Sequence, residues 1–108
     1  MPPIKIYKFG GASVRSAEGV ENLARIVAAE PARLLVIVSA MGKTTNALEE
    51  VLDRFMRNRS DEAIELFAEI ERYHRQIVRS LFADPSSVEA RTEKLASEVR
   101  ELLRSETC

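Results

Sequence analysis

Apolar and polar residues alternate in one short stretch near the start of the chain, and a second stretch is continuously apolar. Residues 4–9 alternate, which predicts a strand, and the run "LLVIVSA" from Leu34 to Ala40 predicts a strand buried on both faces. Between them, Ser16 is placed to cap a helix to about Ala29, with one face formed by Val20, Leu23, Ala24 and Val27. The pattern predicts a βαβ unit with parallel strands, because the connection is long enough for a helical crossover.

The remaining two thirds of the chain has the period of about 3.6 residues that is typical of helices. A first helix is predicted from Thr45 to about Met56, with an apolar face made of Leu48, Val51, Leu52 and Phe55. Ser60 or Asp61 is predicted to cap the next helix, which ends near "FADPSS" and has an apolar stripe made of Ala63, Leu66, Phe67, Ile70, Tyr73, Ile77 and Leu81.

A third helix is predicted after Asp84 and Pro85, which stop the preceding one. Ser86 and Glu89 match the S-x-x-E capping box, in which each end of the motif satisfies a free backbone N–H of the other. The apolar face expected for this last helix consists of Val88, Leu95, Val99 and Leu102. The chain is therefore predicted to be a βαβ unit followed by about three helices.

A parallel sheet usually has both faces covered and more than two strands, because its two open edges and buried apolar backbone are otherwise poorly satisfied. The sequence ends after a helix, with no return to the sheet. We therefore expect residues 1–108 to form one incomplete domain, the N-terminal portion of a larger α/β domain, with no second domain. The open strand edges predict a homo-oligomer.

Composition narrows the classes of function. The chain has 108 residues, of which 45% are hydrophobic and 31% charged, and 16 basic against 17 acidic residues give a net charge of -1. This balance predicts no electrostatic binding to nucleic acid or to an anionic membrane. The one cysteine, Cys108, has no partner for a disulfide, and no apolar run has the length of a signal peptide or a membrane span. We expect a cytoplasmic protein.

The first stretch that carries candidate chemistry is "IKIYKFGGASV", residues 4–14. Alternation places Lys8 on the same face as Ile4 and Ile6, where an ammonium group is costly unless an anion meets it at the end of the strand. Gly10 and Gly11 permit backbone conformations closed to other residues and let a ligand approach the main-chain N–H groups. Such a loop before a helix suits a phosphate. A simple strand-to-helix turn, with Lys8 reaching water, is the alternative.

The second stretch is "VSAMGKTTNAL", residues 38–48, which brings Ser39, Lys43, Thr44, Thr45 and Asn46 to the end of the second strand. Ligands of parallel sheets bind beyond the carboxyl ends of the strands, so both polar loops are expected at the same edge. "GKTT" does not complete a Walker A loop, because the first glycine of that motif would fall at Ile37. For Thr44 to Asn46, helix capping alone is the alternative.

These two stretches carry a family resemblance. "KFGGASV" resembles the K-F-G-G-T-S-V opening of aspartokinases, and "VSAMGKTTNAL" is similar to their second block, in the same order and at a similar distance. The resemblance implies the amino acid kinase fold, a three-layer α/β/α sandwich of which this chain is the beginning. It also implies transfer of the ATP γ-phosphate to the side-chain carboxylate of L-aspartate, the first step of lysine, threonine and methionine biosynthesis.

The resemblance implies a role for each matching residue. Lys8 would contact the transferring phosphoryl group, Gly10, Gly11 and Ser13 would line the nucleotide phosphates, and Ser39 and Thr45 would contact aspartate, with Mg²⁺ bridging the phosphates. No residue of this chain is assigned as a metal ligand. Ala12 departs from the usual threonine and removes one hydroxyl. The family's other site residues lie beyond Cys108, so the 108 residues alone are expected to be inactive.

Two other functions stay open at this point. A kinase of the same fold could act on glutamate, N-acetylglutamate or uridylate, or the chain could be a non-catalytic helical interaction module. His74, the one histidine, is expected to be structural. Solvated helix faces and ion pairs are the expected explanation for the carboxylates of Glu49, Glu50, Glu62, Glu65, Glu69 and Glu71.

Overall fold

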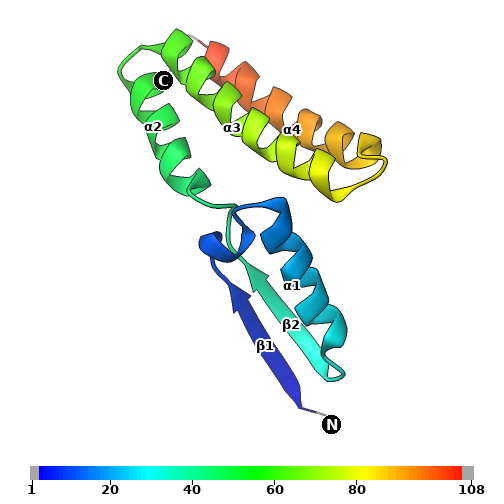
Figure 1. The fold of residues 1–108 in the computed structure, drawn as a ribbon. Coiled ribbons are helices and arrows are strands. Elements are labelled where there is room, and N and C mark those ends of the chain that lie inside the picture. Colours follow the sequence, from blue (N-terminus) through cyan, green and yellow to red (C-terminus); the bar gives the residue numbers. More distant parts are fainter. Residues whose placement is uncertain (1–2, 106–108) are drawn as a thin grey trace. The chain divides into compact units, whose positions relative to one another are not determined.

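The structure is a computed structural model that describes residues 3–105. Its elements follow in the order β1, a short 3-10 helix, α1, β2, α2, α3 and α4 (Figure 1). The chain divides into two compact units, which we call the sheet unit, up to Lys43, and the helical unit, from Thr44 onward.

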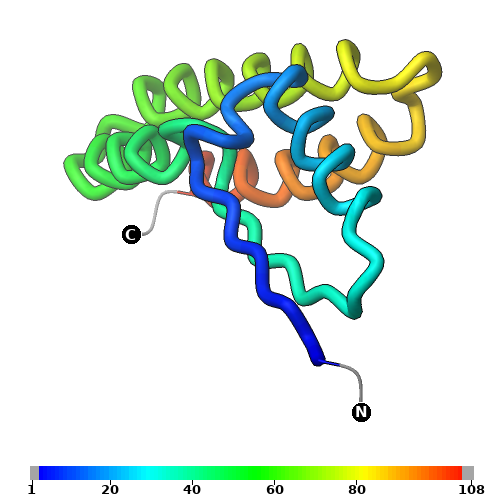
Figure 2. Tube along the Cα trace, turned by 60° about the horizontal axis from the view of Figure 1, so that its bottom comes forward, coloured from blue at the N-terminus to red at the C-terminus, as the bar shows by residue number. Residues whose placement is uncertain are grey.

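The sheet unit is the predicted βαβ arrangement. β1 (Ile4–Phe9) and β2 (Arg33–Val38) pair in parallel, with Ile4 opposite Arg33 and Phe9 opposite Val38. α1 (Ala17–Ala29) connects them and runs beside the strand pair in both views (Figures 1 and 2). The Ser16 hydroxyl accepts a hydrogen bond from the Gly19 backbone N–H at 3.2 Å. The predicted N-cap is therefore confirmed.

The two faces of the strand pair differ in burial. Tyr7 and Phe9 are half-buried, and the Tyr7 hydroxyl donates to Glu30 just after α1, which identifies this face as the one toward α1. The opposite face exposes Ile4, Ile6, Leu35 and Ile37, with Ile6 63% exposed. The prediction that the second strand is buried on both faces is therefore wrong for the described residues, because α1 lies along one face alone. The strand also ends at Val38, two residues earlier than expected.

The helical unit consists of α2 (Thr44–Met56), α3 (Ser60–Leu81) and α4 (Ser86–Arg104). Its core draws residues from all three helices: Val51, Ala63, Phe67, Ala96 and Leu103. The stripe predicted for α3 is confirmed, since all its members are buried or half-buried. On α2, Val51 is buried and Phe55 half-buried, but the predicted Leu48 and Leu52 are exposed.

The buried face of α4 is displaced from the predicted one. Leu95 and Leu102 are exposed, whereas Ala96 and Leu103 enter the core, and Val88 and Val99 are half-buried as expected. One residue corresponds to a rotation of roughly 100° about a helix axis. The apolar spacing alone does not fix that rotation, because Leu102 and Leu103 are adjacent and equally apolar; packing against α3 selects Leu103.

Two predicted helix caps are wrong. Ser60 is the first residue of α3, and the residue before it, Arg59, makes no side-chain capping bond. Ser86 lies inside α4 instead of before it, and its hydroxyl donates to the Asp84 carboxylate at 2.7 Å. Glu89 accepts from Arg79 of α3 at 2.6 Å. The capping box does not form, because the Ser86 hydroxyl is bonded to Asp84 and the Glu89 carboxylate is bonded to Arg79.

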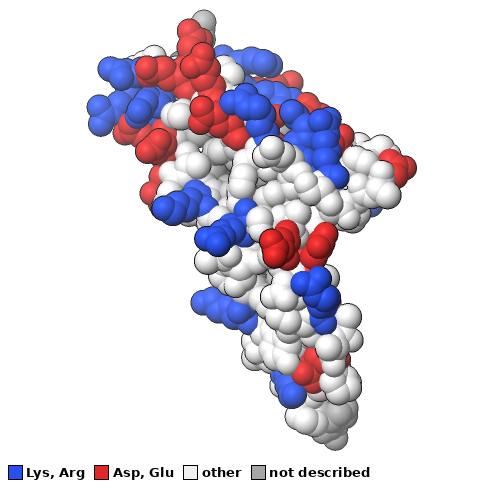
Figure 3. Space-filling view, in the orientation of Figure 1, with Lys and Arg blue, Asp and Glu red and all other residues white. Residues whose placement is uncertain are grey.

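Charges of both signs are interleaved over the helical unit on the face drawn in Figure 3. No helix within residues 3–105 is long and apolar enough to cross a membrane.

Candidate functional site

Five of the six predicted site residues lie in the sheet unit, at the carboxyl ends of its strands. Lys8 is the last residue but one of β1, and Gly10, Gly11 and Ser13 follow in what we call the first loop, residues 10–16. Ser39 comes directly after β2 and begins what we call the second loop, residues 39–43. The strand order therefore brings both polar stretches to one edge.

Backbone hydrogen bonds join the second loop to the end of β1 and to the first loop. The backbone N–H of Ser39 donates to the Phe9 carbonyl at 2.9 Å, which continues the strand pairing one residue past β2. The N–H of Gly42 donates to the Gly11 carbonyl at 3.0 Å. The expectation that the loops open at the same edge of the sheet is therefore confirmed.

The first loop is held by a 3-10 turn over Gly11–Val14, in which the Ser13 N–H donates to the Gly10 carbonyl at 3.0 Å. Val14 is 2% exposed and anchors the turn in the sheet unit. Between residues that the structure describes, the backbone N–H groups of Gly10, Gly11 and Ala12 have no hydrogen-bond acceptor. These donors remain available to an anion.

The two glycines of this loop do not adopt the unusual backbone conformations that were expected of them. Neither has a positive φ; among the described glycines, Gly42 alone does, at 56°. A Cβ atom built on Gly11 would lie 2.5 Å from the Gly42 carbonyl oxygen, whereas one on Gly10 would meet nothing within 4 Å. Gly11 is therefore required by the approach of the second loop, and Gly10 borders open space through which a ligand has access.

The two lysines of β1 have different surroundings. Lys5 pairs with the Glu30 carboxylate, with a nitrogen-to-oxygen distance of 3.2 Å. Lys8 is exposed, lies beside Ile37 in the register, and pairs with no acidic side chain in the part of the chain that the structure describes. The expected position of Lys8 on the face of Ile4 and Ile6 agrees with the alternation of burial along β1. Lys5 therefore has a structural ion pair, whereas Lys8 is available to bind an anion.

Glu30 ties the beginning of β1 to the end of the crossover. Its carboxylate accepts from the Tyr7 hydroxyl at 2.5 Å and from the Ala32 N–H at 3.1 Å, in addition to its pair with Lys5. The Tyr7 hydrogen bond is the main cause that lowers the pKa of Glu30, and the same bond raises the pKa of Tyr7. This cluster fixes the strand pair on the side away from the loops.

A hollow of about 410 Å³ lies beside the first loop. Ser13 lines it, and the sequence reasoning missed its other polar members, which are Arg15, Ser16, Glu18, Asn22 and Arg25. Ser13 and Ser39 are both exposed. Gly42 was also missed as a site residue, although a glycine between a strand and a helix is a usual signal of positive φ.

The sixth predicted residue, Thr45, belongs to the helical unit. It is exposed in the first turn of α2, whereas its neighbour Thr44 is 9% exposed. The structure therefore groups Thr45 with α2 and not with the five residues of the sheet unit.

In the helical unit, His74 and two of the helix carboxylates contact other residues of the same unit. His74 Nδ1 lies 2.8 Å from the Ile70 carbonyl oxygen, and its ring packs edge-on against Tyr73. Among the predicted helix carboxylates, Glu71 pairs with Arg100, and Glu62 with Arg54 and Arg59. Within residues 3–105, no group of three or more His, Cys, Asp or Glu side chains could hold a metal ion.

Known proteins resemble this chain in sequence. The model of the amino acid kinase family matches residues 3–106. Aspartokinase 1, chloroplastic, of Arabidopsis thaliana is 39% identical over 95 residues, and aspartokinase 2, chloroplastic, of the same plant is 32% identical over 93 residues. Each match covers 83% of this chain but only 16% and 17% of the relative.

A bifunctional aspartokinase/homoserine dehydrogenase 1, chloroplastic, of Zea mays is 33% identical over 79 residues, which are 72% of this chain and 8% of the relative. The chain thus spans less than a fifth of each of these proteins. Because the family model covers nearly all of its length, the chain belongs to the amino acid kinase family.

Proposed function

We propose that the protein carrying this chain is an aspartate kinase, which transfers the γ-phosphate of ATP to the side-chain carboxylate of L-aspartate and forms 4-phospho-L-aspartate. The observation that carries the proposal is the junction of the two loops at the carboxyl end of the strand pair, through the bond from Gly42 to Gly11. The names of the three plant relatives, all aspartokinases, support aspartate as the acceptor. In this proposal the reaction is the first step of lysine, threonine and methionine biosynthesis.

The first loop supplies the nucleotide end of the proposed site. Gly10 and Gly11 would present free backbone N–H groups to the phosphate oxygens, and the exposed hydroxyl of Ser13 would add a side-chain donor. Lys8 would contact the transferring phosphoryl group, whose charge is spread over its oxygens. A cation and aligned N–H groups are what that charge distribution requires, and the unpaired donors of residues 10–12 fit this task.

The second loop would supply the acceptor end. The aspartate carboxylate is ionised at neutral pH, so its attack on phosphorus needs no general base. Catalysis then consists of positioning and charge neutralisation. The hydroxyls of Ser39 and Thr45 would donate hydrogen bonds to aspartate. The role of Thr45 rests on the sequence resemblance.

When bound, Mg²⁺ would neutralise part of the phosphate charge. The described residues fit the phosphates better than the metal, because they provide N–H donors and a lysine but no cluster of carboxylates. Protein ligands for the metal are therefore proposed to lie in parts of the protein outside this chain. For the same reason we propose that the 108 residues alone do not catalyse the reaction.

The test uses the full-length protein and a matched pair of lysine variants on one strand. Lys8→Ala is expected to lower kcat by about 100- to 1000-fold, the usual cost of removing one group that stabilises developing charge. Lys5→Ala is the control, because Lys5 pairs with Glu30 on the opposite face. ATP consumption with aspartate, measured by a coupled assay, distinguishes them. Unchanged activity of Lys8→Ala would contradict the proposal.

The same assay tests the acceptor and the need for the rest of the protein. Aspartate is expected to be phosphorylated in preference to glutamate, N-acetylglutamate and uridylate, and the 108-residue chain is expected to show no turnover. A preference for another acceptor would keep the fold and change the substrate. Failure of the full-length protein to bind ATP would favour a non-catalytic helical interaction module.

Location and assembly are also proposals. We keep the cytoplasm as the proposed compartment; the chloroplast appears in the names of the plant relatives and is a property of those proteins. Self-association through the open strand edges is proposed for this chain, and light scattering after size exclusion would measure it. A monomer at all concentrations would contradict this.

A further inference from the structure

The contact between Gly11 and Gly42 leaves no room for a side chain. A Cβ on residue 11 would lie 2.5 Å from the Gly42 oxygen and 3.3 Å from the Ala40 oxygen, whereas ordinary contacts begin at about 3.4 Å. Both opposing atoms belong to the backbone, so neither can turn aside as the end of a flexible side chain would. A larger residue at position 11 would have to displace the whole second loop.

We propose that Gly11 is a positioning residue that sets the spacing between the first and second loops and thereby couples the nucleotide and acceptor ends of the site. The inference rests on the proposed kinase function for its kinetic consequence. It assigns to Gly11 a task distinct from phosphate binding: its missing side chain admits the Gly42 carbonyl. Gly10, where an added Cβ meets nothing, has no such task.

Backbone hydrogen bonds hold the second loop near both of its ends, which explains why a change at Gly11 would reach the acceptor end. The N–H of Ser39 is bonded to the Phe9 carbonyl, and the N–H of Gly42 is bonded to the Gly11 carbonyl. Gly42 also has a φ of 56°, a conformation that side-chain-bearing residues other than Asn and Asp rarely adopt. Pushing this loop outward would break the hydrogen bond at Gly42 and pull on the segment that begins at Ser39, the proposed aspartate contact.

The structural part of the proposal is tested on the 108-residue chain by amide hydrogen exchange followed by NMR. The Gly42 N–H is expected to be protected in the wild type and to lose that protection in Gly11→Ala. Gly10→Ala is the matched control, one residue away, and is expected to keep the protection. Equal protection of Gly42 in all three chains would overturn the proposal.

The kinetic part is tested on the full-length protein by measuring kcat and both KM values. A displacement of about 1 Å in a site can cost on the order of 100-fold in rate, so Gly11→Ala is expected to lower kcat/KM by up to that amount, with the KM raised for both ATP and aspartate. Ser39→Ala is expected to raise the KM for aspartate alone. A purely structural defect would reduce the active fraction and hence kcat, with both KM values unchanged, and would overturn the proposal.

A second pair of variants applies if Gly11→Ala does not fold. Gly42→Ala, which strains the backbone at φ 56°, is expected to raise both KM values, and Gly42→Asn is expected to restore them in part because Asn tolerates this region. Unchanged KM values in Gly42→Ala would overturn the coupling. If the wild-type protein phosphorylates no acceptor, the proposed function fails, while the exchange experiment still decides whether Gly11 holds the second loop.

Discussion

The sheet unit and the helical unit bury their apolar side chains to different degrees. Among residues 3–105, the helical unit contains seven of the eight buried hydrophobic residues, and the sheet unit contains one, Val14. The strands instead expose Ile4, Ile6, Leu35 and Ile37 on the face opposite α1. Five of the six candidate site residues nevertheless lie in the sheet unit. Packing and candidate chemistry are therefore concentrated in different parts of this chain.

The largest expected effect tests whether the helical unit has a specific core. Leu103→Ala is expected to reduce the free energy of unfolding by about 2–5 kcal/mol, because Leu103 is 7% exposed and packs in the core of α2, α3 and α4. Leu102→Ala is the matched control: the same residue type, one position earlier, is 68% exposed. Its expected change is within about 0.5 kcal/mol. Urea unfolding followed by circular dichroism measures both.

Similar losses of unfolding free energy in the two leucine variants would contradict the difference in burial between the two units. That result would mean that α4 packs through Leu102 as well as Leu103, and that the helical unit has no more specific a core than the sheet unit. A large cost for Leu102 alone would restore the face predicted from the sequence spacing.

The sequence predicted the fold well where one pattern had one physical solution. The βαβ unit followed from three local signals: the alternation in residues 4–9, the apolar run that forms β2, and the Ser16 cap. The errors arose where two solutions have similar free energies. Leu102 and Leu103 are equally apolar, so only the surface of α3 decides the rotation of α4, and the capping side chain of Ser86 had a carboxylate partner at Asp84.

The candidate site could likewise be predicted only in part from the sequence. Parallel strands end at one edge of a sheet, so the meeting of the two loops followed from the order of elements. The reason for Gly11 did not follow, because it depends on a backbone contact with Gly42, which is distant in sequence. The surroundings of Lys8 did not follow from the sequence either, since the sequence does not show that Glu30 pairs with Lys5 and not with Lys8.

A smaller effect concerns the acid response of the sheet unit, which depends on Glu30. Its pKa is lowered from the usual 4.5, chiefly by the Tyr7 hydrogen bond, so its contribution to stability is present above pH 4.5 and is lost as the pH falls through the lowered value. Glu30→Gln is expected to remove this acid dependence from NMR signals of the sheet unit and leave those of the helical unit unchanged.

Tyr7→Phe sharpens the test, because it removes the main cause of the shift and keeps the carboxyl group. The NMR titration of Glu30 is expected to move upward toward 4.5 in this variant. The raised pKa of Tyr7 has the opposite sign: its contribution is present below pH 10.0 and is lost as the pH rises through the raised value. A wild-type Glu30 that titrates at its usual value would contradict both expectations.

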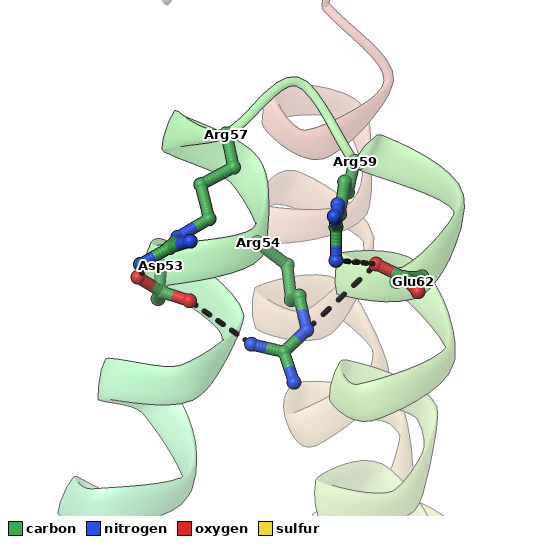
Figure 4. Close-up of polar contacts among 5 residues, drawn as sticks. All are labelled: Asp53, Arg54, Arg57, Arg59 and Glu62. Atoms are coloured by element: carbon green, nitrogen blue, oxygen red, sulfur yellow. Dashed lines mark hydrogen bonds and ion pairs between the residues drawn. The ribbon is translucent and has the colours of Figure 1, made fainter.

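The smallest expected effect lies at the turn between α2 and α3, where the helical unit has its own charged cluster. Figure 4 shows Arg54 of α2 lying between Asp53 and Glu62, with Arg57 and Arg59 beside them. Arg54 is 2.9 Å from Asp53 and 3.7 Å from Glu62, and Glu62 is also 3.7 Å from Arg59. These side chains are partly or largely exposed, so water and salt screen their attraction.

Glu62→Gln is therefore expected to lower the free energy of unfolding of the helical unit by less than about 1 kcal/mol, and the loss should shrink further as salt is added. Urea unfolding at low and high ionic strength measures it. Leu103→Ala provides the reference, because burial of an apolar side chain is not screened by salt. A loss for Glu62→Gln as large as that for Leu103→Ala would mean that charge pairs, and not the apolar core, distinguish the helical unit from the sheet unit.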